Sequence, residues 1–177
     1  MKVLVTGAGG FLGRGLIVPF ESKHTLRLMD VVDWPTPHEK IVGDVADLET
    51  CRRAVQGMDA IVIAHMASRQ AGAYEAPTVA FDVNVKGTAN LFFAAAEQGI
   101  RRVVLISTGG VVGAYKGSFL SRDLPLKAVS LYGLTKALQE IVAEQYHREF
   151  GFQVAVLRLG YILSADDHDN VVDKYGH

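Results

Sequence analysis

Four glycines within seven residues follow the first apolar run of the chain, and this feature restricts the fold more than any other. The run 2–6 (KVLVT) is typical of a buried strand, and the segment after it (GAGGFLG) leads into a helical pattern. Gly7, Gly10 and Gly13 would permit a tight turn, a close approach of the backbone to a pyrophosphate, and close packing of helix on sheet. The positive helix N-terminus favours a phosphate there. This placement predicts a dinucleotide site, with a ligand-free tight turn as the alternative.

Short β-branched runs alternate with helical segments along the rest of the chain. The expected strands are 2–6, 25–30, 40–42, 60–64, 102–107 and 154–159, and the expected helices are 11–20, 47–55, 76–98 and 130–150. Continuous apolar strands separated by helices predict a parallel sheet with helices on both faces, the doubly wound α/β (Rossmann) architecture. We expect Pro19 to bend or end the first helix and Asp47 to cap the second. Residues 109–129 are expected to form a long loop.

Composition favours a single soluble domain. The chain has 177 residues, of which 49% are apolar, enough for a real core. Residues 1–160 are expected to form the cofactor domain and 161–177 a polar tail. Eighteen basic and nineteen acidic residues give a net charge of −1, so little net field draws the chain to nucleic acid or to an anionic membrane. The single cysteine, Cys51, permits no intrachain disulfide and fits a reducing, cytoplasmic compartment. No apolar run approaches the roughly 18–20 residues that span a bilayer.

Acidic residues stand where two of the expected strands end. A carboxylate at Asp30 can accept hydrogen bonds from both ribose hydroxyls of NAD and would repel the 2′-phosphate of NADP. Asp33 is an alternative for this role, and Arg14 is the one feature that favours a phosphate. At the end of the third strand, Asp44 could accept a hydrogen bond from the adenine amino group while Val45 packs on the ring. A simple turn role for Asp44 is equally well supported.

Several further motifs follow in a specific order. They are Thr6-Gly7-x-x-Gly10-x-x-Gly13, Asp30, Gly43-Asp44-Val45, His65-Met66-Ala67, Asn84-Val85-x-Gly87-Thr88, Ser107-Thr108, Tyr132-x-x-x-Lys136-x-x-x-Glu140 and Leu157-Arg158. With these motifs, the chain resembles the extended short-chain dehydrogenase/reductases, the NAD-dependent epimerase/dehydratase group, from Val3 to about Tyr161. Within that group, residues 25–30 and 130–133 look most like uronate dehydrogenases.

The resemblance implies NAD as the cofactor and a set of residues that contact it. These are Gly7, Gly10, Phe11, Leu12, Gly13, Asp30, Asp44, Val45, His65, Met66, Ala67, Asn84, Tyr132 and Lys136. Asn84 would contact the nicotinamide half, or otherwise be a polar residue near the start of a helix. His65 is not expected to bind a metal, because no second ligand stands at a suitable spacing beside it. A hydrogen-bonded turn histidine is compatible with the implied role.

The resemblance also implies a catalytic set of Thr108, Tyr132 and Lys136. Tyrosine and lysine four residues apart share one face of a helix. A nearby ammonium, together with the positive nicotinamide, lowers the tyrosine pKa from its usual value of about 10 toward that of a useful base. Thr108 would hydrogen-bond the substrate oxygen. Taken alone, the pair would more often be a surface pair, but its place after the fifth strand favours catalysis. Glu140 is expected to form a solvated ion pair with Lys136 or Lys127.

Apolar spacing on the two long helices predicts which side chains face the core. The expected inward residues are Phe81, Val85, Thr88, Phe92 and Ala95 on the first helix and Leu134, Leu138 and Ile141 on the second. Phe93 is assigned to the core together with Phe92. Cys51 is expected to be a small apolar filler.

Two functions remain open. The first is an NAD-dependent oxidoreductase, epimerase or dehydratase that acts by hydride transfer on a hydroxyl of a sugar or sugar-nucleotide-like substrate. The second is a non-catalytic NAD-binding module. The catalytic set favours the enzyme, whereas the smaller substrate-binding lobe of family members is largely absent here and favours the module. Gly109 and Gly110 stand where uronate dehydrogenases carry polar side chains. The resemblance also implies a homodimer that packs through helices 76–98 and 130–150.

Overall fold

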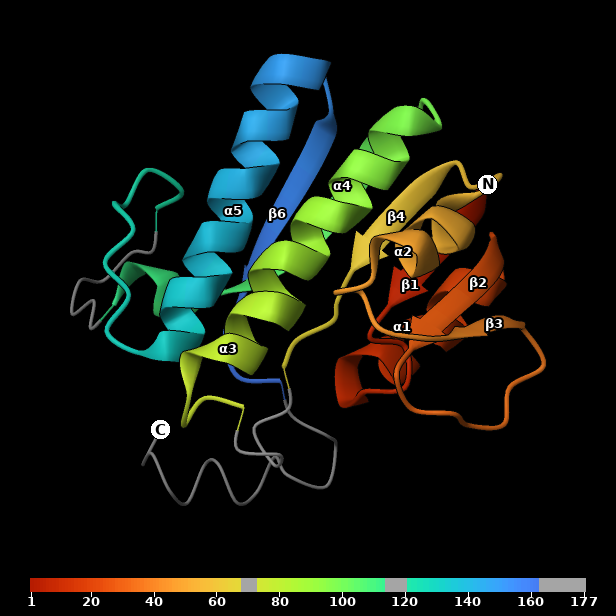
Figure 1. Ribbon diagram of the computed structural model, residues 1–177, viewed down its shortest axis with the longest axis horizontal. Helices are drawn as coiled ribbons and strands as arrows, with labels where there is room; N and C mark the ends of the chain where they lie inside the picture. Colours follow the sequence, from red (N-terminus) through yellow and green to blue (C-terminus); the bar gives the residue numbers. More distant parts are fainter. Residues whose placement is uncertain (68–72, 114–120, 163–177) are drawn as a thin grey trace.

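A computed structural model describes residues 1–67, 73–113 and 121–162. Its centre is one parallel sheet of six strands in the order β3-β2-β1-β4-β5-β6 (Figure 1). The strands are β1 (Lys2–Thr6), β2 (Thr25–Asp30), β3 (Glu39–Val42), β4 (Ala60–Ile63), β5 (Arg102–Thr108) and β6 (Gln153–Leu159). The predicted doubly wound parallel sheet is therefore confirmed. Residues 163–177, most of the predicted tail, lie outside the described residues.

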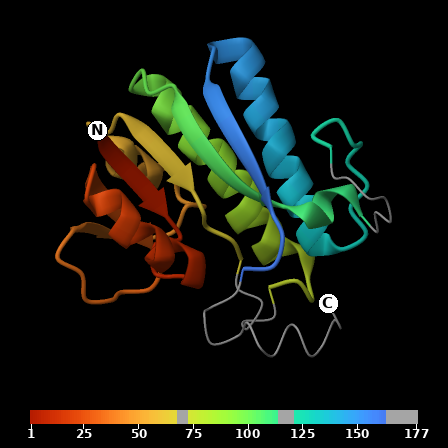
Figure 2. The same cartoon turned by 180° about the vertical axis from the view of Figure 1, so that it is seen from behind.

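Helices lie on both faces of this sheet, as predicted. They are α1 (Phe11–Glu21), α2 (Leu48–Val55), α3 (Pro77–Ala80), the π-helical turn η2 (Phe81–Lys86), α4 (Gly87–Glu97), the 3₁₀ turn η3 (Gly109–Val112) and α5 (Leu131–Phe150). Among the described helices, α1 packs alone on one face, and α2, α4 and α5 pack on the other (Figures 1 and 2). Figure 2 shows β5 and β6 with no described helix in front of them. None of the helices in the described ranges has the length and apolar character of a membrane span.

Two main hydrophobic clusters flank the sheet, because successive side chains of a strand point to opposite faces. Leu4 of β1 belongs to the larger cluster, which joins the sheet to Leu91 and Phe92 of α4. Its neighbour Val5 belongs to the smaller cluster, which contains Trp34 and is covered by half-buried residues of α1. β1, at the centre of the sheet, thus buries apolar side chains on both faces, which explains its continuous apolar run. β6, at the edge, leaves Val156 and Leu157 37% and 44% exposed.

Caps define several helix ends. The Asp47 carboxylate accepts hydrogen bonds from the backbone N–H groups of Glu49 and Thr50, which confirms its predicted capping of α2. Pro19 lies in the last turn of α1, which ends at Glu21, close to the expected position. At the C-terminus of α5, Gly151 has φ +70°, a conformation that favours glycine.

The segment predicted as one helix over 76–98 is helical without a break from Pro77 to Glu97, so the prediction is largely confirmed, but a π-helical turn lies within it. The π-helical turn η2 separates α3 from α4 and shifts the helix face that follows it. Phe81, predicted to be buried, is exposed, whereas Thr88 and Phe92 are buried as expected. Phe93 is 43% exposed and was wrongly assigned to the core. The Arg52 guanidinium lies 5.7 Å from the centre of the Phe93 ring.

The inward face of α5 was also predicted wrongly. Leu134 and Ile141 are 43% and 46% exposed, and the buried side chains are instead polar or small, among them Thr135 and Gln139. These polar groups bond to the neighbouring helical segment, Thr135 to Asn84 and Gln139 to Thr88. Apolar periodicity alone misses a helix face that is buried through hydrogen bonds. The loop expected at 109–129 likewise begins with the 3₁₀ turn η3, and residues 114–120 lie outside the described ranges.

Candidate active site

Three adjacent strands end at the same edge of the sheet and bring the predicted site residues together. β1, which ends at Thr6, pairs with β4, and β4 pairs with β5, which ends at Thr108. The glycine-rich loop follows β1, His65 follows β4, and η3 follows β5. The first turns of α5, with Tyr132 and Lys136, pack against η2, β5 and η3. In parallel α/β sheets, ligands bind at this carboxyl edge.

The glycine-rich loop leaves no room for side chains. Gly7 has φ +67°, and a Cβ atom there would lie 2.6 Å from the Cα of His65. A Cβ on Gly13 would lie only 2.2 Å from the carbonyl oxygen of Gly7. The N–H of Gly10, at the start of α1, donates to that same oxygen at 3.1 Å. The loop therefore forms a bare backbone cradle at a helix N-terminus, and a pyrophosphate fits these residues.

Asp30 ties the loop to β2. One oxygen of its carboxylate accepts from the N–H of Gly9 at 2.9 Å, and the other accepts from Val32 at 3.1 Å. Asp33, the alternative ribose acceptor, is exposed and forms an ion pair with Lys40, whose hydrogen bond and charge lower the Asp33 pKa. The position beside the loop favours Asp30 over Asp33 for the ribose contact.

The predicted adenine contacts receive less support. Asp44 is exposed and accepts from the N–H of Ala46 at 2.8 Å, the turn role that the sequence left open. Val45 is buried in the core beside Gly87, where a Cβ atom would lie 2.4 Å from a Val45 methyl carbon. Contacts of Asp44 and Val45 with adenine stay predictions.

At the start of α1, Phe11 is exposed and Leu12 half-buried, beside the cradle. Beyond β4, Met66 is exposed and Ala67 buried. His65 is buried, and its Nδ1 lies 2.9 Å from the hydroxyl of Thr6. Burial, and then the charge of Lys136, lower the His65 pKa to about 3, so the ring is neutral at physiological pH.

Asn84 is enclosed in a polar network. Its side-chain oxygen accepts from the N–H of Ala67 at 2.8 Å, and its amide nitrogen donates to the hydroxyls of Thr135 at 2.8 Å and Tyr74 at 3.2 Å. Asn84 thereby joins the segment after β4 to η2 and α5. Direct contact of Asn84 with nicotinamide stays a prediction. Sequence reasoning missed Thr135, although its place between the motif residues Tyr132 and Lys136 was a usable signal.

The three predicted catalytic residues have different surroundings. Lys136 is 3% exposed, and burial lowers its pKa to about 8, although the nearby Glu140 carboxylate acts in the opposite direction. The half-buried Tyr132 ring lies edge-on to Tyr74, with ring centres 5.5 Å apart. Thr108 is half-buried, and its hydroxyl accepts from the N–H of Gly110 at 3.2 Å, which caps η3. A buried, readily titrated ammonium beside a tyrosine is suited to acid–base work.

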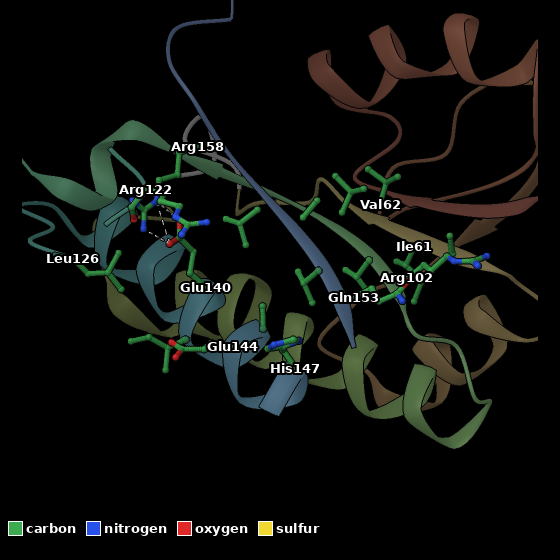
Figure 3. A pocket seen from close by; sticks show the side chains of 18 of the residues that line it. Ile61, Val62, Arg102, Arg122, Leu126, Glu140, Glu144, His147, Gln153 and Arg158 are labelled. Atoms are coloured by element: carbon green, nitrogen blue, oxygen red, sulfur yellow. Dashed lines mark hydrogen bonds and ion pairs between the residues drawn. The ribbon is translucent and has the colours of Figure 1, made fainter. Parts of the chain in front are cut away.

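Glu140 does not form the solvated ion pair that the sequence predicted. Its side chain is 9% exposed and binds Arg158 of β6, with the shortest contact, from Nη2, at 2.9 Å. Ser107 of β5 donates a further hydrogen bond to the same carboxylate. Figure 3 shows Arg158 and Glu140 facing each other. The strand register that places Arg158 opposite Ser107 is a long-range feature, which helical spacing could not show.

Glu140 and Arg158 line part of a cavity of about 1230 Å³ (Figure 3). The cavity lining comes mainly from β4, β5, β6 and α5, and not from the glycine-rich loop.

Cys51 is buried, as expected for an apolar filler, and burial raises its thiol pKa to about 12. Within the described ranges, no three His, Cys, Asp or Glu side chains gather in a way that could hold a metal ion.

Comparison with known proteins supports the predicted resemblance. Residues 3–175 match the model of the NAD dependent epimerase/dehydratase family. A uronate dehydrogenase of Pseudomonas syringae pv. tomato is 31% identical over 167 residues, which cover 90% of this chain and 58% of that protein. An L-arabinose 1-dehydrogenase (NAD(P)(+)) of Haloferax volcanii is 29% identical, with 98% of this chain and 72% of the relative covered.

Solved structures agree with the fold. A short-chain dehydrogenase/reductase superfamily protein from Agrobacterium tumefaciens with bound NAD superposes with a TM-score of 0.80 at 32% identity, covering 89% of this chain and 48% of that one. The UDP-glucose 4-epimerase of Thermus thermophilus in complex with NAD superposes with a TM-score of 0.81 at 25% identity. The match covers 89% of this chain and 54% of that one.

The chain thus spans little more than half the length of the uronate dehydrogenase it matches. The family match nevertheless extends over almost all of its residues, and its motifs stand at the expected edge of a parallel sheet. The chain belongs to the NAD-dependent epimerase/dehydratase family.

Proposed function

We propose that this chain binds NAD and supplies the acid–base residues of a dehydrogenase, epimerase or dehydratase that acts on a hydroxyl of a sugar or sugar-nucleotide-like substrate. One observation carries the proposal most. Lys136, a buried lysine with a lowered pKa, follows Tyr132 on α5 at the edge where the glycine cradle lies. A chain that only bound NAD would need no such proton-transfer pair.

The cofactor proposal rests on the cradle and on Asp30. The bare backbone at Gly7, Gly10 and Gly13 fits a pyrophosphate, and the half-buried Asp30 carboxylate beside it fits the two hydroxyls of an adenosine ribose. Relatives with solved structures contain NAD. NAD is therefore proposed over NADP, whose 2′-phosphate the carboxylate would repel.

The proposed chemistry divides between cofactor and protein. When NAD⁺ is bound, its nicotinamide ring supplies the hydride acceptor. Tyr132, as the phenolate, takes the proton of the substrate hydroxyl, and the Lys136 ammonium stabilises that phenolate. Thr108 at the end of β5 hydrogen-bonds the same substrate oxygen and orients it. Thr6 and Asn84 hold His65 and α5 in place around these groups.

A substitution of Tyr132 by Phe tests the proposal. We expect turnover, followed as NADH formation with uronic acids, aldoses and nucleotide sugars, to fall by about 100-fold or more, while NAD affinity changes little. Tyr146→Phe on the same helix is the matched control, because that ring packs on Phe92 away from the site. Undiminished turnover of Tyr132→Phe would remove Tyr132 from the acid–base role.

A non-catalytic NAD-binding module is the second candidate. It is supported by the glycine cradle and Asp30, which fit NAD by themselves and need no proton-transfer pair. The module predicts NAD binding by calorimetry with no NADH formed from any substrate class. Substrate-dependent NADH formation that Tyr132→Phe abolishes excludes it.

A homodimer through α4 and α5 is proposed as well. Phe93 on α4 and Leu134 and Ile141 on α5 are large apolar side chains left exposed on these helices. A dimer that packs through these two helices would cover such side chains. Sedimentation velocity should show a dimer that Ile141→Glu converts to a monomer, and a wild-type monomer would contradict the proposal.

A reducing, cytoplasmic location is proposed from the single, buried Cys51.

A further inference from the structure

A polar cluster lies directly beside the proposed catalytic residues and joins three elements of the fold. Glu140 on α5 stands one helical turn after Lys136, Ser107 on β5 immediately precedes Thr108, and Arg158 lies on β6. The Glu140 carboxylate accepts from both Ser107 and Arg158. The Ser107–Glu140 contact therefore joins two elements, β5 and α5, that each carry a proposed catalytic side chain.

The Arg158–Glu140 pair has a fixed geometry. The Arg158 Nε lies 3.1 and 3.2 Å from the two carboxylate oxygens, and its Nη2 lies 2.9 Å from one of them. Two nitrogens of one planar guanidinium thus engage one carboxylate, which limits rotation of both side chains. The remaining Nη1 donates to the carbonyl oxygen of Arg122 at 3.3 Å, in the segment that leads into α5.

We propose, on the basis of the function proposed above, that Glu140 is a positioning residue that holds the Thr108 end of β5 and the Lys136 turn of α5 at a fixed spacing. Arg158 is its anchor on β6, and Ser107 is its contact on β5. The cluster touches neither cofactor nor substrate in this role. It acts through Thr108 and Lys136, whose mutual placement decides whether substrate hydroxyl and phenolate can meet.

Electrostatics give Glu140 a second effect on the same site. Lys136 is faced by His65 from the end of β4 and by Glu140 from its own helix, and Tyr132 precedes it on the same face. Burial lowers the Lys136 pKa, and the Glu140 carboxylate opposes that change. His65 is neutral above its pKa of about 3 and adds no positive charge. Glu140 therefore helps to keep Lys136 protonated near neutral pH.

Glu140→Gln provides the test, because it keeps the size and a hydrogen-bond acceptor for Ser107 but removes the charge. The titration of Lys136 is followed by NMR in protein with ¹³C-labelled lysine, with the resonance assigned through Lys136→Met. We expect the Lys136 pKa to fall below the wild-type value of about 8. Glu144→Gln, one turn further along α5 and exposed, is the matched control and should leave the titration unchanged.

Turnover gives the second readout. In Glu140→Gln, kcat should fall and its pH profile should shift, while KM for NAD stays close to the wild-type value. In Glu140→Asp, which keeps the charge, the Lys136 pKa should return part of the way to its wild-type value. A lower melting temperature with an unchanged Lys136 titration and an unchanged pH profile would show a merely structural role and overturn the proposal.

Two further outcomes are distinguishable. If Glu140→Gln does not fold, because Arg158 is left unpaired, the double variant Glu140→Gln/Arg158→Met removes both charges and is titrated instead. If the wild-type chain forms no NADH, the proposed function fails. The Lys136 titration requires neither NAD nor substrate, so it still decides whether Glu140 controls the protonation state of Lys136.

Discussion

The Asp30 carboxylate accepts a hydrogen bond of 2.9 Å from the backbone N–H of Gly9, so the end of β2 holds the glycine-rich loop in its conformation. A Cβ atom on Gly9 would lie 3.2 Å from the same carboxylate. One side chain thereby serves both the shape of the cradle and the proposed recognition of the ribose.

Asp30→Ala should reduce the preference for NAD over NADP. The repulsion of the 2′-phosphate disappears, and binding of NAD weakens because its ribose loses an acceptor. Calorimetric titration with NAD⁺ and NADP⁺ measures both affinities. Asp33→Ala is the control, since that exposed carboxylate pairs with Lys40. If Asp30→Ala leaves the preference for NAD over NADP unchanged, or if Asp33→Ala reduces that preference instead, Asp33 and not Asp30 recognises the ribose.

Gly13→Ala and Gly15→Ala should change stability in opposite directions. A Cβ at position 13 would lie 2.2 Å from a backbone oxygen, whereas at position 15 it meets no atom within 4 Å. Gly13→Ala should therefore destabilise the fold and weaken NAD binding. Gly15→Ala, in an exposed helix interior, should stabilise it by about 0.5–1 kcal/mol. Urea unfolding measures both, and equal midpoints for the two variants would contradict the cradle geometry.

Lys136→Met should stabilise the protein at neutral pH. The lysine pKa falls from 10.5 to about 8 on folding. Keeping the ammonium buried therefore costs about 3 kcal/mol below pH 8. Between about pH 8 and 10.5 the unfolded chain binds more protons than the folded one, so wild-type stability rises with pH. The stability gained by Lys136→Met, measured by urea unfolding, should shrink between about pH 8 and 10.5. A gain that does not change with pH would contradict the lowered pKa of Lys136.

His65→Asn should remove part of the acid sensitivity of the fold. The histidine pKa falls from 6.5 to about 3 on folding, chiefly through burial. As the pH drops through this range, the unfolded chain binds the proton first, so wild-type stability falls. Asparagine retains a hydrogen-bonding group for Thr6 but does not titrate. Unfolding midpoints at pH 7 and pH 5 should therefore differ less in the variant than in the wild type. The half-buried His38, paired with Glu21, offers a control in His38→Asn.

Local sequence signals predicted the strands, most helix boundaries and the glycine cradle. Val3, Leu4 and Val5 must all be buried because both faces of a parallel sheet are covered, and this requirement makes a continuous apolar run visible in the chain. Gly7 and Gly13 are equally visible, because only glycine fits their contacts. Asp47 caps its helix through neighbours two and three residues away, so its role was local too.

The sequence by itself determined the fold class, the family and the order of the motif residues. Only the tertiary structure decided which polar groups meet: Glu140 binds Arg158 and Ser107, and Asn84 binds Thr135, across 18 to 51 positions of sequence. It likewise decided that α5 buries Lys136 and exposes Leu134. The physical reason is that strand and helix periods are set by nearest neighbours along the chain, whereas buried hydrogen bonds depend on the register of elements that meet only after folding.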